Sequence, residues 1–394
     1  MSKLPIPFNK PYVTGQEFGF IQTAINQGQL SANGQFSRLC QDWLQESIGC
    51  SRAFLVHSGT AALELGALLM NLQPGDEVIM PSFTFVTTAT AVVLRGGIPV
   101  FVDIRPDTLN IDEKVIEAAI TPKTRAIMPV HYGGVGCAME RIAEVADAHD
   151  LYVFEDAAHT VETKYQGRPL GSFGDIAALS FHETKNITCG EGGALLINDE
   201  SLIDRAEVLV EKGTDRRQFL LGQVDKYTWR DVGSSFLASE IEAAFLWAQI
   251  QEATSLTARR LAIWEHYKRG LGPLEKLGVC RLPIVPADCE HNGHVFYLLL
   301  NSKEKRDALL AHLRNSGIGA VFHYIPLHDS PGGKKFGRAN GSLHNTQQVS
   351  DCLLRLPLWV EMTTDIQNRV IDAVFQFFGE KYAVKSEELG SVVS

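Results

Sequence analysis

A lysine stands in a turn of small and polar residues directly after an apolar run. Residues 176–181 form the run, which ends at Ser180 and Phe181, and Lys185 follows in His182-Glu183-Thr184-Lys185-Asn186. The glycines of Gly190-Glu191-Gly192-Gly193 come next and let backbone approach a ligand closely. A lysine amine can bond covalently to a carbonyl compound or act as a base. The competing interpretation is an ordinary solvated lysine.

Two acids and a histidine follow a second apolar run. Residues 152–154 lead into Glu155-Asp156-Ala157-Ala158-His159. In open α/β sheets, ligands bind outside the carboxyl ends of the strands. A carboxylate at Asp156 could hold a proton on a ring nitrogen through a charge-assisted hydrogen bond. It could equally cap the turn that follows.

The third segment is His57-Ser58-Gly59-Thr60-Ala61-Ala62, between an apolar run and a helical pattern. Free N–H groups and the helix dipole make the start of a helix a phosphate site. A plain helix cap with a tight turn would have the same sequence. Taken together, a phosphate turn, Asp156 and Lys185 are the parts that pyridoxal 5'-phosphate (PLP) requires. The combination predicts a PLP enzyme in which Lys185 carries the cofactor as a Schiff base.

Alternating strands and helices must position these segments. Short apolar runs at residues 54–56, 77–80, 99–102, 126–130 and 152–154 alternate with helical patterns at 60–71, 87–94, 112–120 and 139–149. This alternation predicts an α/β fold with a mixed, mostly parallel sheet that is covered on both faces. Residues 176–181 and 194–197 follow without a long helix between them and could be adjacent strands.

The C-terminal part has a different pattern. One long helical region is expected over residues 238–269, then a strand at 295–300, a helix at 303–315, a strand at 320–322 and a helix at 365–378. We therefore expect a large PLP-binding domain at residues 1–250 and a smaller α+β domain at 251–380. Residues 381–394 are small and polar, and are expected to be a disordered tail.

Composition narrows the class of protein. The 394 residues carry a formal net charge of −10, which disfavours nucleic-acid binding, and the seven cysteines form no C-x-x-C pair that would suggest zinc or a disulfide framework. No signal peptide, membrane span or metal site is indicated. We expect a cytoplasmic protein. A Rossmann oxidoreductase is disfavoured because no G-x-G-x-x-G motif follows a strand.

At these motifs the sequence resembles the DegT/DnrJ/EryC1/StrS family of sugar aminotransferases, from Pro7 to about Phe378. The resemblance implies fold type I and a homodimer with shared active sites. It is strongest to a subgroup that converts dTDP-4-keto-6-deoxy-D-glucose to dTDP-4-amino-4,6-dideoxy-D-galactose. The segments that carry it are Ser180-Phe181-His182-Glu183-Thr184-Lys185-Asn186, Asp225-Lys226-Tyr227-Thr228-Trp229-Arg230-Asp231 and Val321-Phe322-His323-Tyr324-Ile325-Pro326-Leu327-His328.

The resemblance also implies roles for single residues. Lys185 would be the Schiff-base lysine and Asp156 the partner of the pyridine nitrogen. Other cofactor contacts would come from Gly59, Thr60, Ser180, Phe85 and His159, the first three at the phosphate. Ser235, in Gly233-Ser234-Ser235-Phe236, matches a segment that crosses to the other subunit's phosphate, although many family members place Asn after the Gly. Packing within the fold is the alternative for Phe85 and for the expected sugar-nucleotide contacts, which are Tyr227, Trp229, His323, Tyr324 and His328.

The expected substrates are therefore L-glutamate and a nucleotide-linked 4-keto-6-deoxy sugar that is aminated at C4. Three alternatives stay open at this point. They are amination at C3 or of another nucleotide sugar, a PLP sugar dehydratase, and a regulator that binds without catalysis. The resemblance implies that dehydratases of this family have His in place of the Schiff-base lysine. Because Lys185 is present here, a dehydratase is disfavoured.

Overall fold

A computed structural model describes residues 4–379 of the chain. Residues 1–3 and 380–394 lie outside the described part, and so does the predicted disordered tail at 381–394. Within residues 4–379, no helix is both long enough and apolar enough to cross a bilayer.

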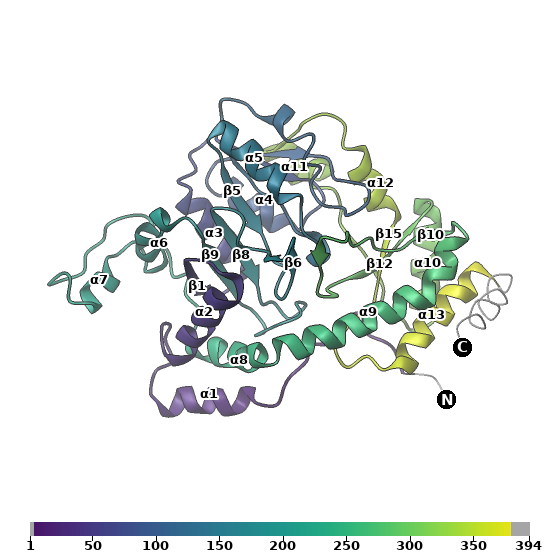
Figure 1. The fold of residues 1–394 in the computed structure, drawn as a ribbon, viewed down its shortest axis with the longest axis horizontal. Helices are drawn as coiled ribbons and strands as arrows, with labels where there is room; N and C mark the ends of the chain where they lie inside the picture. Colours follow the sequence, from purple (N-terminus) through teal and green to yellow (C-terminus); the bar gives the residue numbers. More distant parts are fainter. Residues whose placement is uncertain (1–3, 380–394) are drawn as a thin grey trace.

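An eight-stranded sheet lies at the centre of the larger half of the molecule (Figure 1). Six neighbouring strands, from β8 to β14, run parallel, while β9 is antiparallel to both β1 and β8. In spatial order the strands are β1 (Arg52–Val56), β9 (Gly193–Ile197), β8 (Ile176–Ser180), β5 (Tyr152–Asp156), β4 (Thr124–Ile127), β2 (Glu77–Pro81), β3 (Ile98–Val102) and β14 (Arg338–Ala339). The expected mixed, mostly parallel sheet is confirmed, and so is the pairing of β8 with β9.

Helices cover both faces of this sheet because successive strand side chains point to opposite sides. In β1, Phe54 and Val56 join the core under α3 (Gly59–Leu69), α4 (Val86–Val93) and α6 (Ile203–Val210). Leu55 joins the opposite core, under α2 (Gln35–Ile48) and α8 (Glu240–Gln251). Helix α5 (Met139–His149) covers the rest of that face, and α1 (Glu17–Asn26) packs on α8.

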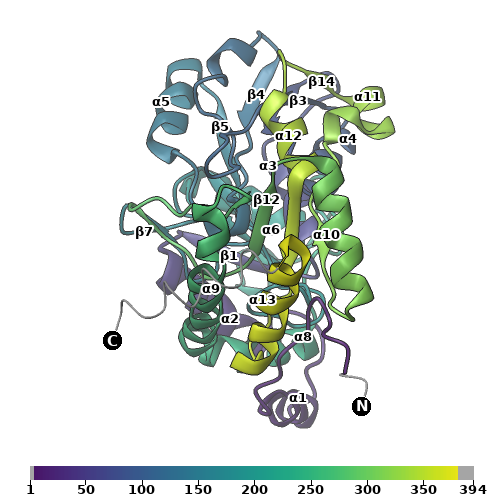
Figure 2. The ribbon, with the colours of Figure 1, turned by 90° about the vertical axis from the view of Figure 1, so that its right-hand side faces the viewer.

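A second, antiparallel sheet is built from the C-terminal part of the chain, with strand order β10-β12-β15-β13. Its strands are β10 (Cys280–Arg281), β12 (Phe296–Leu300), β15 (Leu353–Leu356) and β13 (Val321–Phe322). Helices α10 (Lys303–Asn315) and α13 (Thr364–Phe378) pack on each other beside this sheet (Figure 2) and share a core with the later turns of α9 (Ala253–Lys276). Strand β14 lies between β13 and β15 in the chain but belongs to the large sheet, so the two sheets are not separated at a single point of the sequence. The division into two domains at residue 250 therefore stays a prediction.

Several short elements connect these layers. A three-stranded sheet joins β11 (Cys289–Glu290), β6 (Lys164–Tyr165) and β7 (Arg168–Pro169). The remaining helices are α7 (Arg216–Leu220), α11 (Pro331–Phe336) and α12 (His344–Cys352), with 3-10 turns η1 (Glu117–Ala119), η2 (Tyr132–Gly134), η3 (Glu200–Leu202) and η4 (Leu327–Asp329). Residues 211–236, which we call the arm, carry α7 away from the body at the left of Figure 1.

Two helix predictions need correction. The helix expected at residues 112–120 is wrong, because only the 3-10 turn η1 forms there. Asp112 Oδ1 accepts the N–H of Lys114, which favours a turn, and Pro122 disfavours helical backbone at Thr121. The single helix expected at 238–269 is two helices, α8 and α9, because Glu252 leaves the helical backbone angles (φ −108°, ψ 9°).

Candidate active site

A cavity of about 340 Å³ opens at the carboxyl ends of β5 and β8, beside the first turn of α3. Residues from β15 and α9 close its other side, so the cavity lies between the two main sheets. The structure brings nine of the predicted site residues into its wall: Gly59, Thr60, Phe85, Asp156, His159, Ser180, Lys185, His323 and Tyr324.

Lys185 reaches the cavity from a tight turn after β8, in which its backbone N–H donates to the carbonyl of His182 at 2.8 Å. Burial lowers the pKa of the Lys185 amine to about 8, with a contribution from the positive charge of Arg355, whereas Asp156 acts in the opposite direction. A lysine with this pKa is partly neutral near pH 7. It can therefore act as a nucleophile or a base, which an ordinary surface lysine at that pH does rarely.

Asp156 ends β5, and its carboxylate lies buried at the cavity floor. Its Oδ2 accepts a 2.7 Å hydrogen bond from Thr88 Oγ1, and its Oδ1 accepts the N–H of Ala158 at 3.2 Å. Burial raises the pKa of Asp156, while Thr88, Ala158 and Lys185 each favour its charged form. A protonated ring nitrogen would supply the opposite charge that this buried carboxylate needs.

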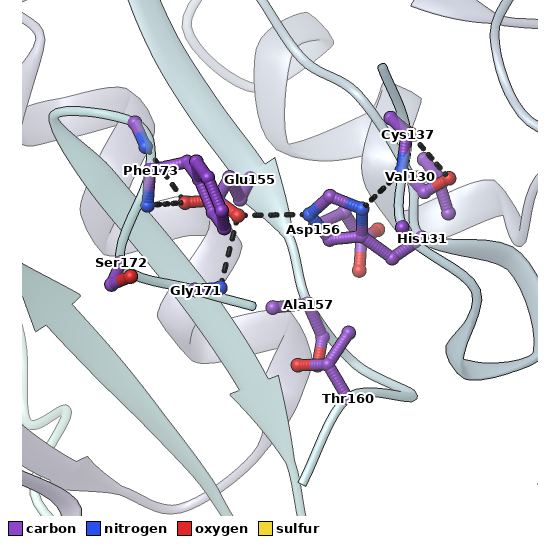
Figure 3. Close-up of polar contacts among 12 residues, drawn as sticks. Val130, His131, Cys137, Glu155, Asp156, Ala157, Thr160, Gly171, Ser172 and Phe173 are labelled. Carbon is purple, nitrogen blue, oxygen red and sulfur yellow. Dashed lines mark hydrogen bonds and ion pairs between the residues drawn. The ribbon is translucent and has the colours of Figure 1, made fainter. Parts of the chain in front are cut away.

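The neighbouring acid, Glu155, has a different role. Its Oε2 lies 2.8 Å from His131 Nε2, and its carboxylate accepts the N–H groups of Gly171, Phe173 and Gly174 (Figure 3). Because His131 Nδ1 accepts the N–H of Cys137, the ring proton lies on Nε2 and is donated to Glu155. Glu155 is absent from the cavity wall and so supports the strand that presents Asp156.

The first turn of α3 lies opposite Ser180. The Ser58 side chain accepts the N–H of Ala61, which caps the helix, and the N–H groups of Gly59 and Thr60 have no partner within residues 4–379. A Cβ at Gly59 would come within 2.8 Å of Ser180 Cβ, so only glycine allows this close approach. Two free N–H groups, a hydroxyl and a helix N-terminus together suit a phosphate.

Phe85 and His159 lie on the cavity wall from other elements. Phe85 precedes α4 and is 58% exposed, which leaves its ring free to stack on a ligand. The ring of His159 packs against that of His294, with centroids 4.2 Å apart. Burial holds the pKa of His159 well below its ordinary value, and its Nδ1 accepts the N–H of Gly133. The neutral ring therefore carries its proton on Nε2, as a donor.

Four predicted residues lie outside this cavity in the single chain. Three are on the arm: Tyr227 and Trp229, which are 52% and 81% exposed, and Ser235, which is also exposed. The fourth is His328, whose Nδ1 lies 2.7 Å from Ser82 Oγ and whose backbone N–H donates to that oxygen, which holds η4 in place. Its contact with the sugar nucleotide stays a prediction.

Among the residues that sequence reasoning missed, four bear on the chemistry of the site: Thr88, Arg260, His294 and Arg355. Thr88 contacts Asp156, and the other three line the cavity. Arg355 could have been recognised in the sequence, because it is a charged residue within the apolar run of β15, Leu353–Leu356. The others could not, since each lies within a pattern that packing alone explains.

A sequence profile of the DegT/DnrJ/EryC1/StrS aminotransferase family matches residues 12–375. The chain belongs to this family. It is a sugar aminotransferase that depends on PLP, which confirms the expected class of enzyme, the fold type and the cofactor.

Related proteins match over nearly the whole chain. The spore coat polysaccharide biosynthesis protein SpsC of Bacillus subtilis (strain 168) is 34% identical over 377 residues, which cover 94% of this chain and 96% of SpsC. The crystal structure of S. venezuelae DesV has 31% identity and a TM-score of 0.87, covering 95% of this chain and 99% of DesV. The PLP form of Spr1654 from Streptococcus pneumoniae has 25% identity and a TM-score of 0.86, covering 95% and 98%.

The cavity fits PLP on its own geometry as well. The N–H groups of Gly59 and Thr60, with Ser180, would hold the phosphate, and Asp156 would hold the ring nitrogen. Lys185 lies on the same wall, within electrostatic reach of Asp156. These residues come from α3, β5, β8 and the turn after β8, so the large sheet supplies each of these contacts.

Proposed function

We propose that this enzyme transfers the amino group of L-glutamate to the C4 ketone of a nucleotide-linked 4-keto-6-deoxy sugar. The proposed reaction converts dTDP-4-keto-6-deoxy-D-glucose to dTDP-4-amino-4,6-dideoxy-D-galactose. The observation that carries the transfer chemistry is that Lys185 and Asp156 share one cavity beneath the first turn of α3. The choice of C4 rests on the resemblance of the segments that contain Lys185, Tyr227 and His323 to one subgroup of the family.

Bound PLP supplies a carbon that accepts the amino group and a ring that withdraws electrons from it. The chain supplies the proton transfer and the positioning. Nζ of Lys185, partly neutral near pH 7, would take the proton from Cα of the amino donor and deliver it to the carbon on the other side of the donor nitrogen. Asp156, which Thr88 helps to keep charged, would pair with the ring nitrogen, and the N–H groups of Gly59 and Thr60 would hold the phosphate, so that Lys185 would meet the donor in a fixed geometry.

We further propose a homodimer in which the arm of one chain completes the active site of the other. Large apolar side chains exposed along the arm support an interface, because monomers rarely expose a contiguous apolar surface. Leu220, Leu221 and Trp229 are 66%, 60% and 81% exposed. In this arrangement Ser235 would reach the phosphate of the other site, and Tyr227 and Trp229 would contact the sugar nucleotide there, beside His323 and Tyr324.

A cytoplasmic location and a role in the synthesis of a surface glycan complete the proposal. All seven cysteines are free, as expected in a reducing compartment. SpsC, which is 34% identical, is a spore coat polysaccharide biosynthesis protein, and this supports the glycan role.

Replacing Lys185 with Ala tests the transfer chemistry. The wild-type protein should show a visible PLP absorbance band that L-glutamate removes, whereas Lys185→Ala should show neither the band nor any turnover. Lys276→Ala, at an exposed position in the last turn of α9, is the matched control and should behave as the wild type does. Turnover by Lys185→Ala would exclude the proposed role of the lysine.

A panel of keto-sugar nucleotides tests the choice of substrate. Each compound is incubated with L-glutamate and the PLP-bound enzyme, and the product is identified by NMR. We expect amination at C4 of the dTDP-linked 4-keto-6-deoxy sugar with the galacto configuration. Amination at C3, or a preference for another nucleotide, would overturn the proposed substrate and leave the aminotransferase chemistry in place.

A further inference from the structure

A buried segment from the second half of the molecule reaches the turn that carries Lys185. Residues 292–294 lie between β11 and β12, and Asn292 and His294 are 1% and 6% exposed. The residue that follows Lys185 is Asn186. Its Nδ2 donates to the carbonyl of Asn292 at 2.9 Å, and its Oδ1 lies 2.9 Å from His294 Nδ1. This segment therefore holds both polar atoms of the Asn186 amide.

These contacts determine where the ring proton of His294 lies. Because a carbonyl only accepts, the atom of Asn186 that meets Asn292 must be the amide nitrogen, which turns the amide oxygen toward the ring. His294 Nδ1 therefore carries a proton and donates it to Asn186 Oδ1. Burial holds the pKa of His294 well below its ordinary value, so the ring is neutral and this single proton is committed to Asn186.

The same segment also holds the turn that follows Asp156. Nδ2 of Asn292 donates to the carbonyls of His159 and Val161 at 2.9 and 2.8 Å. Its Oδ1 accepts the N–H of His294 at 3.1 Å. The amide of Asn292 thus uses both of its N–H groups and its oxygen inside the protein, so its orientation is fixed. One segment joins the turn after β5 to the turn after β8.

Helix α9 supports this segment from another side. Arg260 Nη2 donates to the carbonyl of His294 at 2.9 Å, and Trp264 Nε1 donates to the carbonyl of Val295 at 3.0 Å. Arg260 and Trp264 are both buried and lie one turn apart on the same face of the helix. The segment is therefore held by a long buried helix as well as by the two turns.

We propose that the segment 292–294 sets the position of the Lys185 turn relative to Asp156. This rests on the proposed role of Lys185 as the residue that bonds to PLP. That bond forms when the neutral amine adds to the aldehyde carbon of PLP and water leaves. The amine must come within bonding reach of this carbon while Asp156 and the first turn of α3 hold the ring and the phosphate. Asn186 and Asn292 are absent from the cavity wall, so they act through the turns that they join.

Two ligands separate the positioning of the lysine from the binding of the cofactor. PLP occupies the site and also bonds to Lys185. Its analogue 4-deoxypyridoxine 5'-phosphate has a methyl group in place of the aldehyde, so it offers the same phosphate and ring nitrogen but forms no bond. A displaced Lys185 turn should therefore slow the bonding of PLP and leave the affinity for the analogue unchanged.

Asn186→Ala and His294→Leu each remove the link between the segment and the Lys185 turn. When PLP is mixed with either apoenzyme, the visible absorbance band should form about 10-fold more slowly or worse, because small displacements of a reacting group cost at least this much in rate. The affinity of both variants for 4-deoxypyridoxine 5'-phosphate, measured by calorimetry, should match that of the wild type.

Two further variants serve as rescue and control. His294→Asn should recover most of the rate, because the Asn amide nitrogen is as many bonds from Cα as His Nδ1 is and can donate to Asn186. Asn345→Ala removes a bond of the same kind outside the cavity wall, from Asn345 Nδ2 to the carbonyl of Ile104 at 2.9 Å. It should behave as the wild type does with both ligands.

Unchanged rates of PLP bonding in Asn186→Ala and His294→Leu would overturn the proposal. So would an equal loss for PLP and for the analogue, which would indicate general damage to the site, or a rescue variant no faster than His294→Leu. If His294→Leu fails to fold, Asn186→Ala decides by the same two measurements. A wild-type apoenzyme that forms no visible band with PLP, or a band that survives in Lys185→Ala, would instead refute the proposed role of Lys185.

Discussion

Thr88 Oγ1 donates a 2.7 Å hydrogen bond to Asp156 Oδ2, from α4 to the end of β5. Thr84 Oγ1 lies 2.9 Å from Thr88 Oγ1. The single hydroxyl proton of Thr88 is committed to Asp156, so Thr84 must be the donor to Thr88. A chain of two hydroxyls thus supports the charged form of the carboxylate against the burial that disfavours it.

Thr88→Val should weaken PLP binding. The substitution keeps the volume of the side chain and removes a hydrogen bond to a charged group, which contributes about 1.5–3 kcal/mol. The affinity for PLP, from absorbance titration of the apoenzyme, should fall at least about 10-fold. Thr90→Val is the control, because the Thr90 hydroxyl contacts only the carbonyl of Thr87 at 3.4 Å. Equal PLP affinities for the two variants would contradict the role of Thr88.

Two substitutions should move the pKa of Lys185 in opposite directions from about 8. Asp156→Asn removes a negative charge that favours the ammonium form, so the pKa should fall. Arg355→Met removes a positive charge that disfavours it, so the pKa should rise. The pH dependence of the rate at which PLP reacts with each apoenzyme gives this pKa. Shifts of the same sign would refute the electrostatic coupling.

Glu155→Gln should lower the free energy of unfolding and make this free energy less dependent on pH in the acid range. Burial acts to raise the pKa of Glu155, but His131 and the backbone N–H groups of Gly171 and Gly174 hold it below the ordinary value of 4.5. The stabilisation is therefore complete above pH 4.5 and is lost as the pH falls through the folded-state pKa. We expect a loss of about 3 kcal/mol in the free energy of unfolding at pH 7, measured with urea.

The loss should shrink as the pH falls below 4.5, where protonation also weakens the wild type. Glu144→Gln provides the control, since this exposed acid pairs only with Arg141 on the surface of α5 and should change the stability by less than about 0.5 kcal/mol. A difference between wild type and Glu155→Gln that stays constant from pH 7 to pH 3 would show that its origin is not ionic.

Gly59→Ala should reduce the affinity for PLP. A Cβ there would lie 2.8 Å from Ser180 Cβ and 3.3 Å from the Leu179 carbonyl, so the first turn of α3 must move away from β8. We expect a loss of about 10-fold or more, since the phosphate contacts depend on that spacing. Gly19→Ala in α1 meets nothing within 4 Å and should stabilise the protein by about 0.5–1 kcal/mol. Full PLP affinity in Gly59→Ala would rule out the close contact as a requirement.

The residues that could be predicted from the sequence are those whose chemistry lies in one local segment. Lys185, Asp156 and Gly59 each follow an apolar run, and parallel strands bring such ends to one edge of the sheet. Thr88 and Arg355 reach the site from segments far away in the sequence, so tertiary packing alone brings them there. His328 lies close in sequence to His323 and Tyr324, which line the cavity, yet its ring contacts Ser82, and this difference depends on the tertiary fold.

Helix prediction succeeded where apolar spacing and flanking residues agreed. Residues 303–315 form a helix with the expected bounds, because Ser302 caps it and its apolar positions face one core. At residues 112–120 the spacing suggested a helix, but side-chain bonds to the backbone and Pro122 favoured turns. The break at Glu252 could not be predicted, because the buried positions continue on both sides of it.

Helix α9 joins the two principal cores of the enzyme. Its first turns pack with α2 and α8 through Ala253 and Leu256, and its later turns pack against the second sheet through Trp264 and Tyr267. Between these two sections, Arg260 faces the cavity. Loss of either core would leave half of the helix without support, and isolated helices of this length are marginal in water. The two halves of the molecule should therefore unfold in one cooperative transition, and a ligand that occupies the cavity should raise the melting temperature of both together.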